Sequence, residues 1–242
     1  MLELRRRLCI LPAMKRFYDT VTLHPVGGGF EIRLDGKPLR TPARAPLGLP
    51  KRPLAEAIAE EWRAQGARLD KRAMPLTALA SAAVDLTERE ALIDGLLAYT
   101  DTDLLCYRAA APDDLVARQD ALWQPLVDEL AARHGVALKV GTGVMPLCQD
   151  KAVGKRLAGL LEAMDAFLLV AVQAATTASG SLVIGLAMAE GILDGERAWE
   201  AASLDEEFQA ARWGRVKEAE AAARERQRTL RTAARMIRLL GR

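Results

Sequence analysis

Residues 166–189 of the chain read AFLLVAVQAATTASGSLVIGLAMA and contain no charged side chain. Their length passes the roughly 20 residues that a membrane-spanning helix needs. The middle of the segment, however, holds polar side chains and a glycine, at Gln173, Thr176, Thr177, Ser179, Gly180 and Ser181. Two buried helices joined near Ser179-Gly180 satisfy these groups more readily than a single membrane span does. We therefore expect the buried centre of a helical domain without membrane insertion, and one membrane span is the alternative.

The neighbouring C-terminal sequence also favours helices. Apolar residues after Pro112 follow helical spacing as far as Gly135, and Pro125 is expected to kink that helix. Residues 136–140 alternate briefly between apolar and other side chains, which indicates a short strand or an extended link. From Lys151 onward the patterns are helical only, and the last helix, over about 216–240, is strongly charged around an apolar stripe. A solvated face is the expected reason for this charge.

The N-terminal part begins with a predicted sheet. Phe30–Leu34 alternates apolar and charged residues, which is typical of a half-exposed strand. Asp35-Gly36, directly after it, is a favoured two-residue hairpin turn. Upstream, Thr20–Leu23 is expected to pair with this strand across the glycine run Gly27–Gly29. That run indicates a turn and not a phosphate loop, because no helix with the required glycine spacing follows it.

Helices follow the predicted sheet. Pro53 suits a first helical position, apolar residues then recur every four positions, and Gly66 is a terminator, so the pattern predicts a helix over 53–65. A second apolar stripe covers residues 76–84. Thr87 and Glu90 have the spacing of a capping box, which predicts a third helix from there through residue 97.

These patterns predict an α+β fold, in which a β-rich α+β N-terminal domain precedes a mostly helical C-terminal domain. The composition shifts near Tyr99, so we expect the domains to cover residues 14–98 and 99–242, with residues 1–13 as an extension. A chain of 242 residues is long enough for one large or two small domains.

Composition and charge narrow the functional classes. Lys and Arg number 34 against 32 Asp and Glu, so the net charge of +2 gives no reason to expect a nucleic-acid partner. The three cysteines, Cys9, Cys106 and Cys148, form no Cys-x-x-Cys pair and no disulfide framework, which favours a reducing compartment and no zinc knuckle.

The sequence lacks the common catalytic motifs. The two histidines, His24 and His134, have no metal ligand at a suitable spacing. Ser179-Gly180-Ser181 lacks the nucleophile-elbow pattern, and Gly154-Lys155 lacks the flanking residues of a Walker loop. We therefore expect no enzyme activity, metal or cofactor. The alternative is a small-molecule enzyme in which clustered carboxylates converge in space, with Asp101, Asp103, Asp205 and Glu206 as candidates.

The acidic block Asp205–Glu207, with Phe208, Gln209 and Trp213, is the remaining candidate site. At helical spacing Glu206, Gln209 and Trp213 share one face, which would combine charge, hydrogen bonding and a large ring. Spacing alone favours a different interpretation, in which the acidic residues are solvated and Phe208 and Trp213 face the core.

Several short segments resemble those of one family and occur in that family's order. In the first half of the chain they are Lys15–Tyr18, Leu34–Pro42, Glu61–Gly66 and Met74–Thr77. Farther on they are Thr100–Arg108, Arg118-Gln119, Trp123–Leu126, Gly180–Leu182, Leu204–Gln209 and Trp213-Gly214. Each segment is weak alone, because short motifs recur by chance. Together they make the chain similar to the ATP synthase alpha-subunit assembly chaperone family, the assembly factor often called "ATP-twelve".

The resemblance implies a function. A chaperone of this family would bind the unassembled alpha subunit of the F-type ATP synthase catalytic head, shield its subunit interface from aggregation and hand it to the beta subunit. No small-molecule substrate is then expected. The heavy use of Ala and Arg favours a bacterial source and hence the cytoplasm, whereas a eukaryotic source would imply the mitochondrial matrix.

The resemblance also implies a client-binding region. In the family, acidic residues of the C-terminal helical region hold the client, and the matching positions here are Asp205, Glu206, Glu207 and Glu218. Gln209 and Trp213 join them as client-binding candidates because they lie on the helix face of Glu206.

Overall fold

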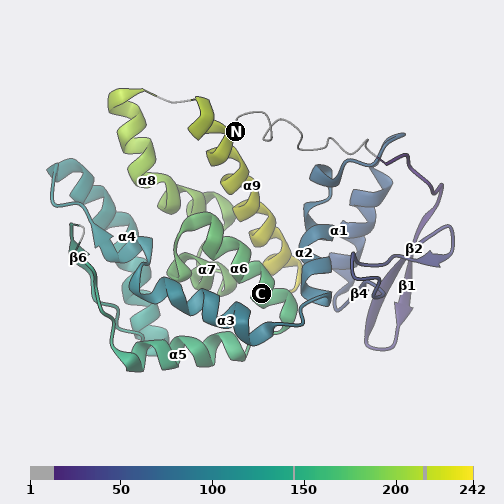
Figure 1. Ribbon diagram of the computed structural model, residues 1–242, viewed down its shortest axis with the longest axis horizontal. Helices are drawn as coiled ribbons and strands as arrows, with labels where there is room; N and C mark the ends of the chain where they lie inside the picture. Colours follow the sequence, from purple (N-terminus) through teal and green to yellow (C-terminus); the bar gives the residue numbers. More distant parts are fainter. Residues whose placement is uncertain (1–13, 144, 215–216, 242) are drawn as a thin grey trace, which may run out of the picture. The chain divides into compact units, whose positions relative to one another are not determined.

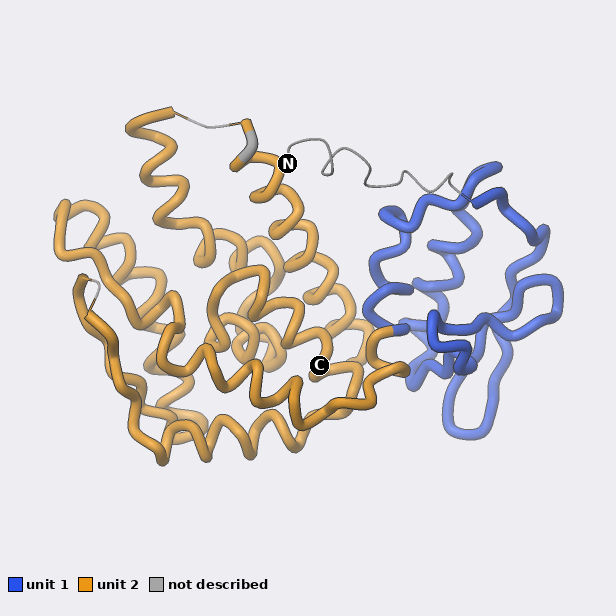
Figure 2. Tube along the Cα trace, in the orientation of Figure 1, with its two compact units in different colours: residues 1–81 blue, residues 82–242 orange. Residues whose placement is uncertain are grey.

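The computed structural model describes residues 14–143, 145–214 and 217–241 (Figure 1). The chain divides into two compact units, residues 1–81 and 82–242 (Figure 2). The domain boundary predicted from the sequence lies after residue 98. Helix α3 (Arg89–Leu97) lies in the second unit because it packs against helices of that unit, α5 and α6. The expected extension over residues 1–13 lies outside the described residues.

The first unit is built on a small antiparallel sheet. Its strands are β1 (Val21–Val26), β2 (Gly29–Leu34), β3 (Lys37–Pro38) and β4 (Gly48–Leu49), with β2 paired to the other three. The expected hairpin is confirmed, since β1 and β2 pair from Val21 with Leu34 to Val26 with Gly29. Asp35 and Gly36 connect β2 to β3 with φ of 48° and 78°, the left-handed conformation that the predicted turn requires.

One face of this sheet is covered by helix α1 (Arg52–Arg63), with a proline in its first turn as predicted. The helix ends at Arg63, ahead of the expected terminator Gly66. Ile32 of the sheet and Leu54 and Ile58 of α1 are completely buried and form the core of the unit. Helix α2 (Pro75–Val84) follows α1 after a short 3-10 turn over Lys71–Ala73.

The second unit is almost entirely helical, and the α+β fold class is confirmed. Its longer helices are α3, α4 (Asp113–His134), α5 (Lys151–Glu162), α6 (Ala166–Ser179), α7 (Leu182–Ala189), α8 (Gly195–Trp213) and α9 (Lys217–Leu239). Two 3-10 turns, over Ala98–Asp101 and Leu104–Cys106, precede a short strand β5 (Tyr107–Arg108), which pairs in parallel with β6 (Gly141–Thr142).

Helices α6 and α7 lie at the centre of the second unit, with α4, α8 and α9 packed against them (Figure 1). The expected pair of buried helices is therefore confirmed. Gly180 ends α6 with φ of 76°, and Ser181 then caps α7 by accepting a hydrogen bond from the Ile184 amide. No helix formed by the described residues is both long enough and apolar enough to cross a bilayer.

Helix α4 contains Pro125, where the expected kink stays a prediction, and it ends before the predicted Gly135, which has φ of 63°. Two other local predictions need refinement or correction. Residues 136–140 form a link without regular secondary structure, and the short strand lies just beyond them, in β6. The predicted capping box at Thr87 is wrong, because Glu88 occupies the cap position of α3 and no side chain caps the helix.

Candidate functional site

The segments that carry the family resemblance bind one another inside each unit. In the first unit, the Tyr18 hydroxyl donates to the Trp62 carbonyl at 2.6 Å, and Arg16 donates to the Gln65 carbonyl at 2.7 Å. The buried carboxylate of Glu61 accepts hydrogen bonds from the backbone amides of Leu76 and Thr77 at the start of α2, at 2.8 and 2.9 Å. These residues therefore hold the fold and offer no free site.

Asp103 has the same role in the second unit. Its carboxylate is 1% exposed and accepts hydrogen bonds from the Ser181 hydroxyl at 2.6 Å and from the backbone amides of Val183 and Leu105, both at 3.1 Å. It therefore joins the Thr100–Arg108 segment to the start of α7. Burial raises the pKa of the Asp103 carboxyl, and these hydrogen bonds oppose that shift.

Several polar contacts join helices α4 and α8, among them the ion pair of Arg212 with Asp114 at 3.0 Å. The Gln119 amide donates to the Asp205 carboxylate at 2.7 Å, while its oxygen accepts from the Ala109 amide at 2.8 Å. The indole of the fully buried Trp123 donates to the Ala201 carbonyl at 2.9 Å. Asp205, a predicted client-binding residue, is therefore half-buried and engaged within the protein.

The alternative of an enzyme with clustered carboxylates gains no support from these residues. Asp103 and Asp205 bind different parts of the second unit, and the Asp101 carboxylate accepts from the Gln149 amide at 2.9 Å. Within the described part of the chain, no group of three or more His, Cys, Asp or Glu side chains is placed to hold a metal ion.

The other acidic residues of the block lie in solvent. Glu206, Glu207 and Gln209 are exposed, and Trp213, the last residue of α8, is 77% exposed. Phe208 is buried, and the guanidinium of Arg212 lies 4.3 Å from the centre of its ring. The sequence-based preference that both aromatic residues face the core is therefore right for Phe208 and wrong for Trp213.

The exposed residues line a groove of about 320 Å³ between the end of α8 and the first turns of α9. One wall comes from α8, with Glu206, Glu207, Gln209, Ala210 and Trp213. The other wall comes from α9, with Ala219, Glu220 and Ala223. We call these residues the acidic groove. Glu206, Gln209 and Trp213 thus line one groove, as their helical spacing predicts.

Glu207 occupies a central position. Besides the acidic groove, it lines a pocket of about 260 Å³ beside Trp199 and a cleft of about 730 Å³ between α8 and α4. The apolar side chains of that cleft include Leu122 and Leu204. The three hollows therefore adjoin one another along α8, with Glu207 at their junction.

The carboxylates of the groove are partly positioned by cations. Glu206 forms an ion pair with Arg226 of α9, and the Arg226 guanidinium lies 5.4 Å from the centre of the Trp199 ring. Glu220 pairs with Arg224 at 3.4 Å. Sequence reasoning missed Glu220, although its spacing of three residues from Ala223 would place both on one face of the last helix. The side chain of the remaining candidate, Glu218, lies outside the described residues.

Comparison with solved structures indicates the class of protein to which this fold belongs. The structure of Atp12 from Paracoccus denitrificans is 42% identical in sequence, has a TM-score of 0.88, and covers 93% of this chain and 98% of that chain. A structure from Agrobacterium tumefaciens is 38% identical, has a TM-score of 0.87, and covers 93% of this chain and 86% of that chain. The fold of this chain is therefore that of the solved Atp12 from Paracoccus denitrificans.

The family follows from two further matches. The family model described as ATP12 chaperone protein matches residues 15–131. The protein atp12, mitochondrial, of Schizosaccharomyces pombe is 27% identical over 222 residues, which cover 86% of this chain and 76% of that protein. The chain belongs to the ATP12 chaperone protein family, and the resemblance found in its sequence is confirmed.

Proposed function

We propose that this protein is an assembly chaperone of the F-type ATP synthase that binds the unassembled alpha subunit of the catalytic head. It shields the subunit interface of that client and then hands the client to the beta subunit. Family membership supports the chaperone class. The observation that carries the proposed contact is the acidic groove, where the exposed indole of Trp213 lies beside Glu206 and Glu207.

The exposure of Trp213 is the first argument for binding at this groove. Trp is among the residues that contribute most to binding at protein interfaces. Trp213 lies at the end of a helix with 77% of its surface free, so a partner could cover it without any rearrangement of the core.

The chemistry of the groove is the second argument. Its acidic members, Glu206, Glu207 and Glu220, surround small apolar side chains of Ala219 and Ala223. Such a surface fits a client segment in which Lys or Arg accompanies an apolar side chain. Charge complementarity of this kind guides association and fixes orientation more than it adds raw affinity.

Charge reversal within the groove tests this function. The variant Glu206→Lys/Glu207→Lys is expected to bind purified alpha subunit at least about tenfold more weakly, because the two reversals replace attraction by repulsion at the contact. Fluorescence anisotropy with labelled alpha subunit measures the dissociation constant. Light scattering on warming the alpha subunit measures protection from aggregation, which should fall in parallel.

The matched control is Glu90→Lys/Asp94→Lys. Both residues are exposed on α3, are four positions apart, and give the same change in charge. This control should bind like the wild type. Equal binding by the groove variant and the wild type would exclude the acidic groove as the contact, and no binding by the wild type would exclude the function itself.

A further inference from the structure

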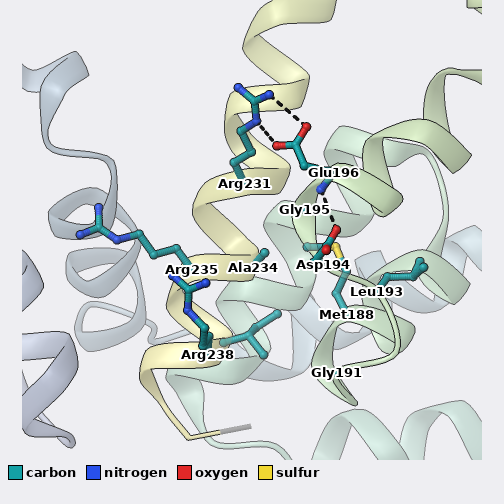
Figure 3. A pocket seen from close by; sticks show the side chains of 11 residues that line it. Met188, Gly191, Leu193, Asp194, Gly195, Glu196, Arg231, Ala234, Arg235 and Arg238 are labelled. Atoms are coloured by element: carbon teal, nitrogen blue, oxygen red, sulfur yellow. Dashed lines mark hydrogen bonds and ion pairs between the residues drawn. The ribbon is translucent and has the colours of Figure 1, made fainter.

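A second hollow lies on α9, away from the acidic groove and near the C-terminal end of the helix (Figure 3). It has a volume of about 510 Å³ and is formed by α9 together with the turn that connects α7 to α8. The apolar side chains that line it are Met188, Leu193, Ala234 and Ile237. Three arginines of α9 complete its lining, Arg231, Arg235 and Arg238. We call it the arginine pocket.

The three arginines lie along one side of α9, because their spacing of four and then three residues matches the helical repeat. Arg231 is engaged by Glu196 of α8 through two contacts, one of them 3.0 Å between Nη2 and Oε2 (Figure 3). Arg235 and Arg238 are exposed and have no hydrogen bond or ion pair with any residue that the structure describes. Two cations at the pocket are thus available to a ligand.

The backbone around the pocket is held closely. A Cβ atom at Gly195 would lie 2.9 Å from the Cα of Arg231, so the start of α8 and the middle of α9 are in near contact. Met188 is 1% exposed and Ile237 is 3% exposed, which ties the inner wall to the core. The pocket therefore combines a closely packed, largely buried apolar wall with two exposed cationic side chains.

The charges of the second unit indicate the chemistry of the occupant. Residues 82–242 hold 19 Lys and Arg against 24 Asp and Glu, a net charge of −5, whereas residues 226–241 contain no acidic residue. A polyanion such as nucleic acid or an anionic membrane would be repelled by the unit as a whole. A short protein segment with one or two carboxylates beside an aliphatic side chain matches both the arginines and the apolar wall.

We propose that the arginine pocket is a second docking surface for the client, one that takes an acidic amphipathic segment of the alpha subunit. This inference rests on the function proposed above. The client would then be held at both ends of α9, with a basic segment at the acidic groove and an acidic segment at the arginine pocket.

The variant Arg235→Glu/Arg238→Glu tests the inference. Its dissociation constant for labelled alpha subunit should rise about tenfold at about 0.05 M salt, and the difference from wild type should shrink at about 0.5 M salt, where exposed charges are screened. The neutral variant Arg235→Gln/Arg238→Gln should fall between the two, because Gln keeps the helix propensity but lacks the charge. Thermal unfolding followed by circular dichroism checks that every variant is folded.

The matched control for charge is Lys151→Glu/Lys155→Glu, which reverses two exposed cations four residues apart on α5. It should leave binding unchanged. The inference would be overturned if the folded arginine variant bound alpha subunit as tightly as the wild type while the Glu206→Lys/Glu207→Lys variant bound it more weakly. The proposed function would then remain intact. The inference would also be overturned if the arginine substitutions weakened binding only to phosphatidylserine vesicles or to single-stranded RNA and left binding to the alpha subunit unchanged.

Discussion

Carboxylates of the second unit differ in how deeply they are buried and in which groups surround them. Asp103 is enclosed by donors from Ser181 and the start of α7, and Asp205 is bound by Gln119. Glu206 and Glu207 follow Asp205 in the chain but are exposed, and Glu206 pairs with Arg226 of α9. A helix turns by about 100° per residue, so neighbouring positions in one acidic block reach quite different environments.

Cysteine reactivity gives a prediction at the same scale. Burial raises the pKa of the Cys106 thiol to about 12, with the nearby Asp103 as a further cause, whereas Cys148 is exposed. Because the thiolate is the reactive form, iodoacetamide at about pH 8 should alkylate Cys148 and leave Cys106 unmodified in the native protein. Peptide mass spectrometry distinguishes the two sites.

Both thiols should be alkylated once denaturant unfolds the chain, which serves as the control. Modification of Cys106 in the native state at the rate seen for Cys148 would contradict the enclosure of this thiol beneath Arg108 and Asp103.

Among the elements, α2 depends most clearly on one distant side chain. The Glu61 carboxylate of α1 accepts from the amides of Leu76 and Thr77 and, at 2.7 Å, from the Thr77 hydroxyl. The variant Glu61→Ala leaves the buried Leu76 amide and the half-buried donors of Thr77 without this partner. We expect the free energy of unfolding to fall by about 2–4 kcal/mol, as measured by urea denaturation followed by circular dichroism.

The neighbouring variant Glu60→Ala is its control. The Glu60 side chain is 69% exposed and pairs only with the nearby Arg63 among its salt-bridge partners in the described residues. Such surface pairs contribute little, so the stability should change by less than about 0.5 kcal/mol. Equal losses in the two variants would show that Glu61 does not support α2 in this way.

Local patterns predicted most elements because each depends on neighbours in the chain. The β1–β2 hairpin, the turn at Asp35 and the break at Gly180 all follow from backbone preferences of a few residues. The prediction of a capping box for α3 was wrong. Thr87 and Glu90 have the right spacing, but Glu88 and not Thr87 occupies the cap position. The division of the units depends on which distant helices α3 contacts, and no local pattern contains that information.

The candidate site was predictable to a similar degree. Helical spacing groups Glu206, Gln209 and Trp213 on one face, and the structure places all three in one groove. Spacing does not say whether such a face meets the core or solvent, and this is why the exposure of Trp213 was missed. Glu220 of the opposite wall comes from another helix, so only the packing of α8 on α9 reveals it.

For the molecule as a whole, the small net charge of +2 conceals two units of opposite sign. Residues 14–81 hold 12 Lys and Arg against 7 Asp and Glu, a net charge of +5, and residues 82–242 have a net charge of −5. Each unit therefore offers a different electrostatic surface to a partner, which the overall composition does not reveal.

Release of the client leads to a prediction at this scale. The sequence contains no Walker loop, so we expect the beta subunit to displace the chaperone by binding the alpha subunit better. An interface of about 800 Å² per partner and a dissociation constant of about 1 µM would protect the client and still permit exchange. Size-exclusion chromatography of the purified complex should show release on addition of beta subunit without nucleotide.

Bovine serum albumin at the same concentration is the control and should leave the complex intact. Persistence of the complex at excess beta subunit, with release only when ATP is added, would contradict displacement by competition.

The continuity of α9 has a consequence for the choice of client. The helix runs unbroken from Lys217 to Leu239, and its rise of about 1.5 Å per residue separates Glu220 from Arg238 by about 27 Å. A Cβ atom at Gly195 would lie 2.9 Å from the Cα of Arg231, so α9 packs closely against the start of α8. A polypeptide whose basic and acidic segments have not yet reached that separation would engage one end alone and dissociate sooner. Helix α9 would then favour subunits that are folded but not yet assembled, because only these could contact both of its ends.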